Sequence, residues 1–187
     1  ISNYNVGDTK EIDLGDYGVH TIRIANTSTP NECSNSGFSQ TACGFVLEFV
    51  DIITTHNMNP KGDYNGKTYN YGWNEDGWSA SSMRTFVNND IYNALPSEIK
   101  SAIINTTVVS GHGSEDTKNF TSIDKLYLLS TAEVFEQGTS NTISYDTARD
   151  VTRQLDYYKN LGVTTNNKSD AIKKNGTVAS WWWLRTP

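Results

Sequence analysis

The chain has 187 residues and a net charge of −6, and its 15 lysines and arginines are scattered without a run. Proteins that bind nucleic acid or lie on anionic membranes usually carry a basic patch, so this pattern argues against both partners. No stretch approaches the ~18 apolar residues of a transmembrane helix, and we expect no membrane insertion by this domain.

Polar uncharged residues and aromatic residues dominate the composition. Asn, Ser and Thr make up about a third of the chain, whereas charged residues are 19%, below the usual ~25%. Ten tyrosines and five tryptophans add aromatic surface that can also form hydrogen bonds. The mixture is typical of an extracellular binding protein, although a polar enzyme rich in β-structure would look similar. The length fits a single domain over residues 1–187.

The first predicted element is a β-hairpin over residues 6–24, with a turn at 15–18. The two cysteines follow, Cys33 and Cys43, which enclose a short polar segment. Their spacing is not Cys-x-x-Cys, and no His or further Cys lies nearby to complete a zinc site. We therefore expect a disulfide that closes a surface loop in an exported protein.

The middle of the chain predicts a central strand, a long loop and two helices. Residues 44–53 form the most apolar run and predict the central strand, and residues 57–78, rich in turn residues and aromatics, predict the loop. Ser81 or Ser82 can cap a helix with one apolar face. A second helix opens after Pro96. The apolar faces of these two helices comprise Met83, Phe86, Val87, Ile91 and Leu95 in the first and Ile99, Ala102 and Ile103 in the second.

The last part predicts strands at 106–110 and 126–130, a helix over 146–161, and a closing strand that carries three consecutive tryptophans. Alternation along that strand places Trp182 and Leu184 on one face and Trp181, Trp183 and Arg185 on the other. A strand with bulky residues on both faces is expected to be covered on both faces. The predicted class is α+β.

The long loop holds the candidate ligand-binding residues Tyr69, Tyr71, Trp73, Asn74 and Asp76. Its aromatic side chains could stack on a sugar or a peptide, and equally could pin the loop to the core. A long loop in a compact domain is often functional.

The same loop supplies carboxylate and amide oxygens, which are the ligands that Ca²⁺ prefers. The spacing does not match an EF-hand, and a solvated acidic turn is the simpler interpretation. We expect no cofactor, with Ca²⁺ as the one open alternative.

The three histidines, His20, His56 and His112, lie far apart in unrelated contexts and favour structural or surface roles. The chain has no Gly-x-Ser-x-Gly elbow, no His-Glu-x-x-His helix and no phosphate-binding loop.

Three stretches resemble a domain of unknown function that is common in surface proteins of gut bacteria. The pattern is Trp followed by Ser-x-Leu-Arg-x-aromatic-Leu-Asn, then Asp-Lys-x-Phe-Leu-Leu-Ser-x-x-Glu, and finally Trp-Trp-Leu-Arg-Ser/Thr-Pro. The matching stretches are residues 78–88, 121–133 and 180–187, with Met83, Val87 and Tyr127 as conservative departures. The first third of the chain matches only in its strand pattern.

The resemblance implies a C-type-lectin-like fold related to the formylglycine-generating enzyme branch, with a twisted antiparallel sheet flanked by two or three helices. It implies structural roles for Trp78, Arg84, Asp124, Lys125, Trp182 and Arg185. Formylglycine-generating activity would need a pair of thiols in the distal part of the fold. Because Cys33 and Cys43 lie early, that activity is not carried over.

Relatives usually continue beyond the Trp-Leu-Arg-Thr-Pro motif into a Gly/Asn-rich segment and a last strand, and in some this segment is hypervariable and forms the ligand face. The chain stops at Pro187. We therefore expect a domain truncated at its C-terminal end, completed by a missing segment or self-associating through the exposed strand edge.

Two classes of function follow from the sequence. The first is a non-catalytic recognition or adhesion module of a bacterial cell-surface protein that binds carbohydrate or protein. The alternative is a metal-dependent hydrolase built from Asp63, Glu75, Asp76 and a His, or a formylglycine-generating-like enzyme. Catalysis requires convergent groups, so a His within hydrogen-bond reach of these carboxylates would favour the alternative.

Overall fold

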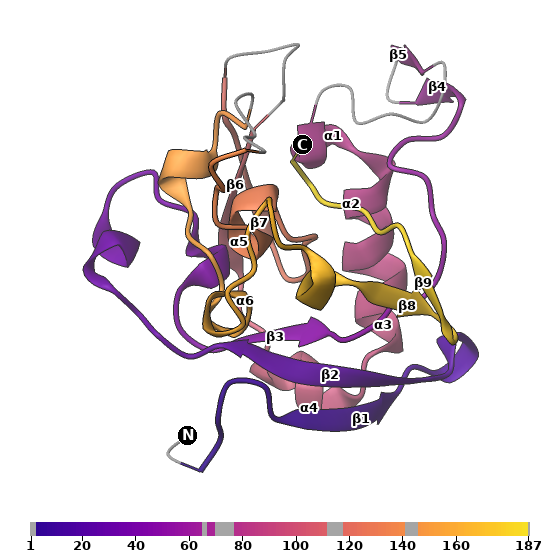
Figure 1. The fold of residues 1–187 in the computed structure, drawn as a ribbon. Helices are drawn as coiled ribbons and strands as arrows, with labels where there is room; N and C mark the ends of the chain where they lie inside the picture. The colour runs from indigo at the N-terminus through magenta and orange to yellow at the C-terminus, as the bar shows by residue number, and fades with distance from the viewer. Residues whose placement is uncertain (1–2, 65–66, 70–76, 112–117, 141–145, 187) are drawn as a thin grey trace.

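A computed structural model describes residues 3–64, 67–69, 77–111, 118–140 and 146–186, and shows a mixed α/β fold of small antiparallel sheets and short helices (Figure 1). Within these residues, no helix has the length and apolar character needed to cross a membrane.

The first sheet contains β1 (Thr9–Asp13), β2 (Val19–Asn26) and β3 (Val46–Phe49) in the order β1-β2-β3, with antiparallel pairing throughout. The predicted hairpin is confirmed, with the 3-10 turn η1 (Gly15–Tyr17) between its strands. Gly18 has φ 84°, a conformation that favours glycine. The prediction of a central strand over 44–53 is wrong, because only 46–49 is a strand and it pairs with β2 alone, on the outside of the sheet.

The loop between β2 and β3 contains two 3-10 turns, η2 (Asn31–Ser34) and η3 (Gln40–Ala42). The predicted disulfide is confirmed: Cys33 and Cys43 are bonded, with their Cα atoms 6.0 Å apart.

The helical segment after the long loop begins with α1 (Gly77–Ala80) and α2 (Ser82–Phe86). A π-helical turn, η4 (Val87–Ile91), and α3 (Tyr92–Ala94) continue it, and α4 (Ser97–Ala102) follows Pro96. Ser81 caps α2 by accepting a hydrogen bond from the Arg84 backbone N–H at 3.1 Å. Both predicted helices are confirmed, whereas the π turn was not predicted.

Three two-stranded hairpins complete the sheets. They are β4 (Gly62–Tyr64) with β5 (Lys67–Tyr69), β6 (Thr106–Ser110) with β7 (Phe120–Asp124), and β8 (Lys173–Asn175) with β9 (Val178–Ser180). The strand at 106–110 is confirmed. The strand at 126–130 is wrong: β7 ends at Asp124, and the Asn88 side chain bonds the backbone of Lys125 and Leu126 in place of a neighbouring strand.

The predicted helix over 146–161 is also wrong. This region contains a 3-10 turn, η6 (Arg149–Val151), an extended stretch, and the short helix α6 (Asp156–Asn160). Long-range hydrogen bonds hold the stretch extended, because the Leu155 N–H donates to Glu133 O at 2.9 Å and the Gln154 side chain donates to Val134 O and Val163 O. The one-turn helix α5 (Thr131–Val134), which was not predicted, provides two of these acceptors, Glu133 O and Val134 O.

The tryptophan segment is not a strand. β9 ends at Ser180, after the 3-10 turn η7 (Ser169–Ala171) and the β8–β9 hairpin. Trp182 and Leu184 pack on the core as expected from alternation, but Trp181 is 98% exposed and Trp183 is 45% exposed. The prediction of cover on both faces is therefore wrong, and only Arg185 on the second face is buried.

Two clusters of buried apolar residues pack on the faces of the first sheet. On one face Ile12, Leu14 and Ile22 form a cluster with Leu95, and the partly buried Ile99 and Ile103 pack against it. On the other face Ala25 and Val46 join a cluster of buried residues from the second half of the chain, including Leu129, Val134, Leu155, Tyr158 and Val163.

Candidate functional site

One cluster of polar residues is sealed inside the protein around Arg185 and Glu133, whose side chains are both 0% exposed. Arg185 Nη1 donates to Glu133 Oε2 at 2.6 Å and to Leu128 O at 2.6 Å, and Nη2 donates to Glu133 Oε1 and to Val109 O. We call this the sealed cluster. It joins the end of the chain to α5 and β6.

Glu133 is further held by Thr41, by Thr152 and by the backbone N–H of Ser130. Burial alone would raise the pKa of the Glu133 carboxyl, but the Arg185 charge and these hydrogen bonds outweigh burial and lower it. Ser130 and Glu133 also form a capping box at the start of α5. Because neither side chain of the ion pair is exposed to solvent, we assign the pair a role in stabilising the fold.

A second cluster is half open and centres on Asp124, which is 3% exposed. Its carboxylate accepts hydrogen bonds from Trp78 Nε1 at 2.9 Å, Arg84 Nε at 2.6 Å and Ser122 Oγ at 2.7 Å. Trp78 is fully buried, whereas the side chain of Arg84 is 34% exposed. This half-open cluster links α1 and α2 to β7.

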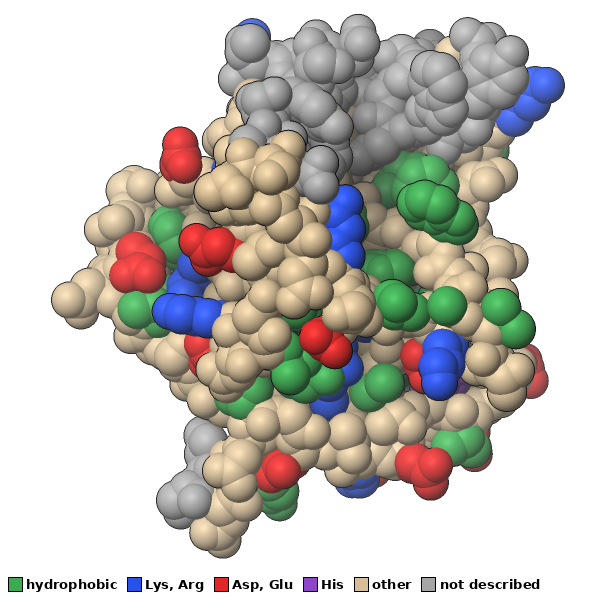
Figure 2. Space-filling model, in the orientation of Figure 1, with side chains coloured by type: hydrophobic (Ala, Val, Ile, Leu, Met, Phe, Trp, Pro, Cys, Tyr) green, Lys and Arg blue, Asp and Glu red, His purple; other side chains and the backbone are tan. Residues whose placement is uncertain are grey.

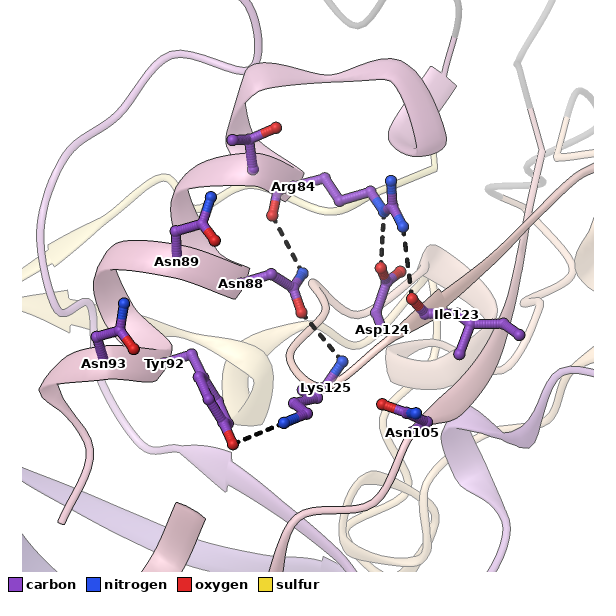
Figure 3. Close-up of a pocket in the computed structure, with 10 residues that line it drawn as sticks. Arg84, Asn88, Asn89, Tyr92, Asn93, Asn105, Ile123, Asp124 and Lys125 are labelled. Atoms are coloured by element: carbon purple, nitrogen blue, oxygen red, sulfur yellow. Dashed lines mark hydrogen bonds and ion pairs between the residues drawn. The ribbon is translucent and has the colours of Figure 1, made fainter. Parts of the chain in front are cut away.

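The outer side of the half-open cluster borders a polar pocket of about 460 Å³, shown in Figure 3. Residues of the α2–η4–α3 segment form one wall, and the end of β7 with Asn105 forms the other. We call it the Asn pocket. It is lined by Arg84, Thr85, Asn88, Asn89, Tyr92, Asn93, Asn105, Ile123, Asp124 and Lys125.

The polar groups of the Asn pocket fall into two kinds. Asn88 is committed to the fold, since it bonds the backbone at Arg84, Lys125 and Leu126. Lys125 Nζ is likewise engaged, 2.8 Å from the Tyr92 hydroxyl and 4.4 Å from the centre of its ring. In contrast, the side-chain amides of Asn89, Asn93 and Asn105 make no hydrogen bond to any described residue, and all three residues are exposed.

The described histidines and Asp63 do not come together. His20 Nε2 lies 2.8 Å from Tyr17 O, and His56 Nδ1 lies 2.6 Å from Asn57 O while its ring stacks on Phe86. The carboxylate of Asp63 accepts from Thr68 Oγ1 at 2.5 Å. No set of three or more His, Cys, Asp or Glu among the described residues could hold a metal ion.

Of the sequence-predicted ligand residues, Tyr71, Trp73, Asn74 and Asp76 lie outside the described residues, as do Glu75 and His112. Tyr69 ends β5, and its side chain is likewise outside the description.

The six residues expected from the resemblance to be structural divide between three places. Arg84, Asp124 and Lys125 line the Asn pocket with the buried Trp78 bonded to Asp124 behind them, and Arg185 lies in the sealed cluster. Trp182 is elsewhere, with its Nε1 donating to Ala171 O at 3.1 Å.

Sequence reasoning missed Glu133 and the three uncommitted asparagines. Glu133 has a signal, because Ser130-Thr131-Ala132-Glu133 fits the Ser-x-x-Glu capping-box pattern. Asn89 and Asn93 are four residues apart, the spacing of neighbours on a helix face. Asn105 has no sequence signal that links it to them.

A family model described as "Domain of unknown function (DUF6273)" matches residues 50–187. The chain belongs to this family. The match begins just after β3 and runs to residue 187, and so includes the half-open cluster, the Asn pocket, Glu133 and Arg185. Comparison with curated proteins gave no match, and comparison with solved structures gave none either.

Proposed function

We propose that this protein is a non-catalytic recognition module of a bacterial cell surface, built on a C-type-lectin-like fold, and that it binds a glycan in the Asn pocket. The observation that carries the proposal is that Asn89, Asn93 and Asn105 line the Asn pocket. Their side-chain amides make no hydrogen bond to any described residue. An amide has both donors and acceptors, as a sugar hydroxyl does, so several amides around one hollow suit a polyhydroxylated ligand.

The charges around the pocket support a ligand recognised through hydroxyls rather than through charge. The Asp124 carboxylate is already paired with Arg84, and Lys125 is engaged by Tyr92. Committed charged groups give a rigid wall, and rigid walls reduce the entropy lost on binding.

The disulfide supports the extracellular part of the proposal. Cys33 and Cys43 are bonded, and structural disulfides are typical of proteins outside the reducing cytosol. A carbohydrate ligand on another cell or on host tissue fits such a location. The aromatic loop before Trp78 stays a prediction as a second contact surface.

A glycan array screened with the purified protein tests the proposal, followed by calorimetry with the best ligand. We expect the double variant Asn89→Ala/Asn93→Ala to weaken binding at least tenfold with an unchanged melting temperature. The matched control is Asn160→Ala, an exposed helical asparagine in α6 outside the pocket, which should bind as wild type does.

Equal binding by the double variant and wild type would contradict the Asn pocket as the site. Failure of every glycan, together with capture of a protein ligand that the double variant still binds, would contradict the carbohydrate assignment as well.

A further inference from the structure

A second hollow lies at the β3 edge of the first sheet and differs in character from the Asn pocket. It is a groove of about 760 Å³ between β3, the helices from α2 to α4 and the segments 126–129 and 180–183. Most of its lining side chains are apolar, and Leu47 on β3 is 40% exposed. Figure 2 shows hydrophobic side chains gathered over the neighbouring region of β8 and β9, above the sheet.

The edge of β3 in this groove carries backbone groups that β2 does not use. The Val50 N–H donates to Thr21 O, and the register places Glu48 opposite Arg23 two residues further along. Hydrogen-bonded pairs alternate along an antiparallel ladder, so the N–H and C=O of Leu47 and Phe49 point away from β2. The Phe49 carbonyl accepts from Lys173 Nζ at 2.5 Å, whereas no described residue bonds the other three groups.

The open stretch of this edge is short and well defined. Immediately beyond it the edge is covered, because the Ile52 N–H donates to Lys174 O at 2.9 Å in β8. An added strand beside residues 46–49 would therefore lie next to β8 and extend the edge pairing that β8 makes at Ile52.

Each Lys, Asp or Glu side chain that lines the groove already has a polar partner, which argues for an uncharged occupant. Glu48 is bonded by Arg23 Nε at 2.8 Å and by Lys173 Nζ at 3.1 Å, and Asp51 accepts the Lys174 N–H. Lys125, which also lines the groove, is engaged by the Tyr92 hydroxyl. An apolar occupant that brings its own backbone donors and acceptors fits both the lining and the edge.

A second copy of this chain fits less well. The β3 edge lies inside a hollow, so two copies would have to bring two concave surfaces together, and each carries a net charge of −6.

We infer that the groove is a peptide-binding site that takes one extended segment with alternating apolar side chains, added as a strand beside β3. Main-chain hydrogen bonds to Leu47 and Phe49 provide the pairing, and the apolar walls select the side chains that face them. The expected completion of the domain by a further segment of its own chain stays a separate prediction.

Fluorescence anisotropy with fluorescein-Lys-Val-Thr-Val-Thr-Val-Lys-amide tests the inference. We expect saturable binding to wild type, and at least tenfold weaker binding of the same peptide with its valines replaced by serine. Leu47→Pro should also weaken binding at least tenfold, because it removes an edge N–H that β2 does not use. Ile172→Lys is the matched control, since Ile172 is an exposed apolar residue outside the groove lining, and it should bind as wild type does.

Amide hydrogen exchange of the wild-type protein provides a readout that does not depend on a variant folding. Saturating peptide should slow exchange at Leu47 and Phe49, while the Glu48 amide, already paired with β2, changes little. Absence of binding, unchanged exchange at Leu47 and Phe49, or equal affinity of Leu47→Pro and wild type would each overturn the inference. Slow exchange at both amides without peptide, in a protein that sediments as a dimer, would also overturn it in favour of self-association.

Discussion

The sealed cluster and the half-open cluster each contain an arginine–carboxylate pair that joins distant parts of the chain, but they differ in access to solvent. Both side chains of the Arg185–Glu133 pair are 0% exposed, whereas in the Arg84–Asp124 pair only the carboxylate is buried and Arg84 is 34% exposed. A pair without access to solvent cannot contact a ligand. The half-open pair shows one side to the core and the other to the Asn pocket, so it can hold the pocket in shape.

The two ion pairs should also differ in how much stability is lost when one partner is removed. A buried ion pair has a net contribution near zero when compared with a well-packed apolar replacement, yet removal of one partner leaves an uncompensated charge in the interior. A pair that is partly open loses less, because water can solvate the arginine that remains.

The largest effect is expected for Glu133→Gln. This change keeps the size of the side chain but leaves the buried Arg185 guanidinium without its counter-charge, so the free energy of unfolding should fall by about 3–5 kcal/mol. Urea unfolding followed by tryptophan fluorescence measures the loss. Glu136→Gln, at an exposed position, is the matched control and should stay within about 0.5 kcal/mol of wild type.

The double variant Glu133→Gln/Arg185→Met decides whether the loss comes from the charge. Removing the arginine as well should recover part of the stability that Glu133→Gln alone removes. A double variant less stable than either single variant would mean that hydrogen-bond geometry, rather than charge, dominates the sealed cluster.

A smaller effect is expected for Trp78→Phe in the half-open cluster. The variant loses the Nε1–H that donates to Asp124 and leaves a gap where the larger indole ring was buried. Asp124 keeps its hydrogen bonds from Arg84 and Ser122. We expect a loss of about 1–3 kcal/mol in urea unfolding. Trp181→Phe, at the 98% exposed ring, should change stability little. Equal losses in these two variants would contradict the assignment of Trp78 to the core.

The elements that could be predicted from the sequence are those fixed by local patterns. The first hairpin has alternating residues and a Gly-rich turn, and the helix after Ser81 has an apolar face and a capping serine. The disulfide followed from the isolation of Cys33 and Cys43 from other metal ligands. Each of these depends on interactions within a short stretch of chain.

Two of the failures, the strand at 126–130 and the helix over 146–161, occurred where hydrogen bonds join parts of the chain far apart in the sequence. Asn88 occupies the backbone groups that would extend a strand at 126–130, and Glu133 and Gln154 lie in the network that keeps the chain before α6 extended. The Asn pocket was missed for the same reason, because only the tertiary fold brings Asn105 to the pocket that residues of the α2–η4–α3 segment line. Local periodicity contains no information about such bonds.

The smallest expected effect is pH-dependent and concerns Asp156, which lies at the start of α6, near the surface and outside both clusters. Burial alone would raise the pKa of its carboxyl, but hydrogen bonds from Arg153, from the Ser28 hydroxyl and from the backbone of Thr27 and Ser28 lower it to about 2, from an ordinary value of 3.8. Since the pKa is lowered in the folded state, the stabilisation is fully present above about pH 4 and disappears as the pH falls towards 2.

Asp156→Asn should therefore be less stable than wild type at neutral pH, and the difference should shrink between about pH 4 and pH 2 in urea unfolding at each pH. The exposed Asp16→Asn serves as control and should follow the wild-type curve at a constant offset. A constant offset for Asp156→Asn as well would show that this carboxylate does not drive acid unfolding. The pH dependence would then be assigned to Glu133, whose pKa is lowered in the folded state by Arg185 and its hydrogen bonds, so that its contribution is also lost as the pH falls.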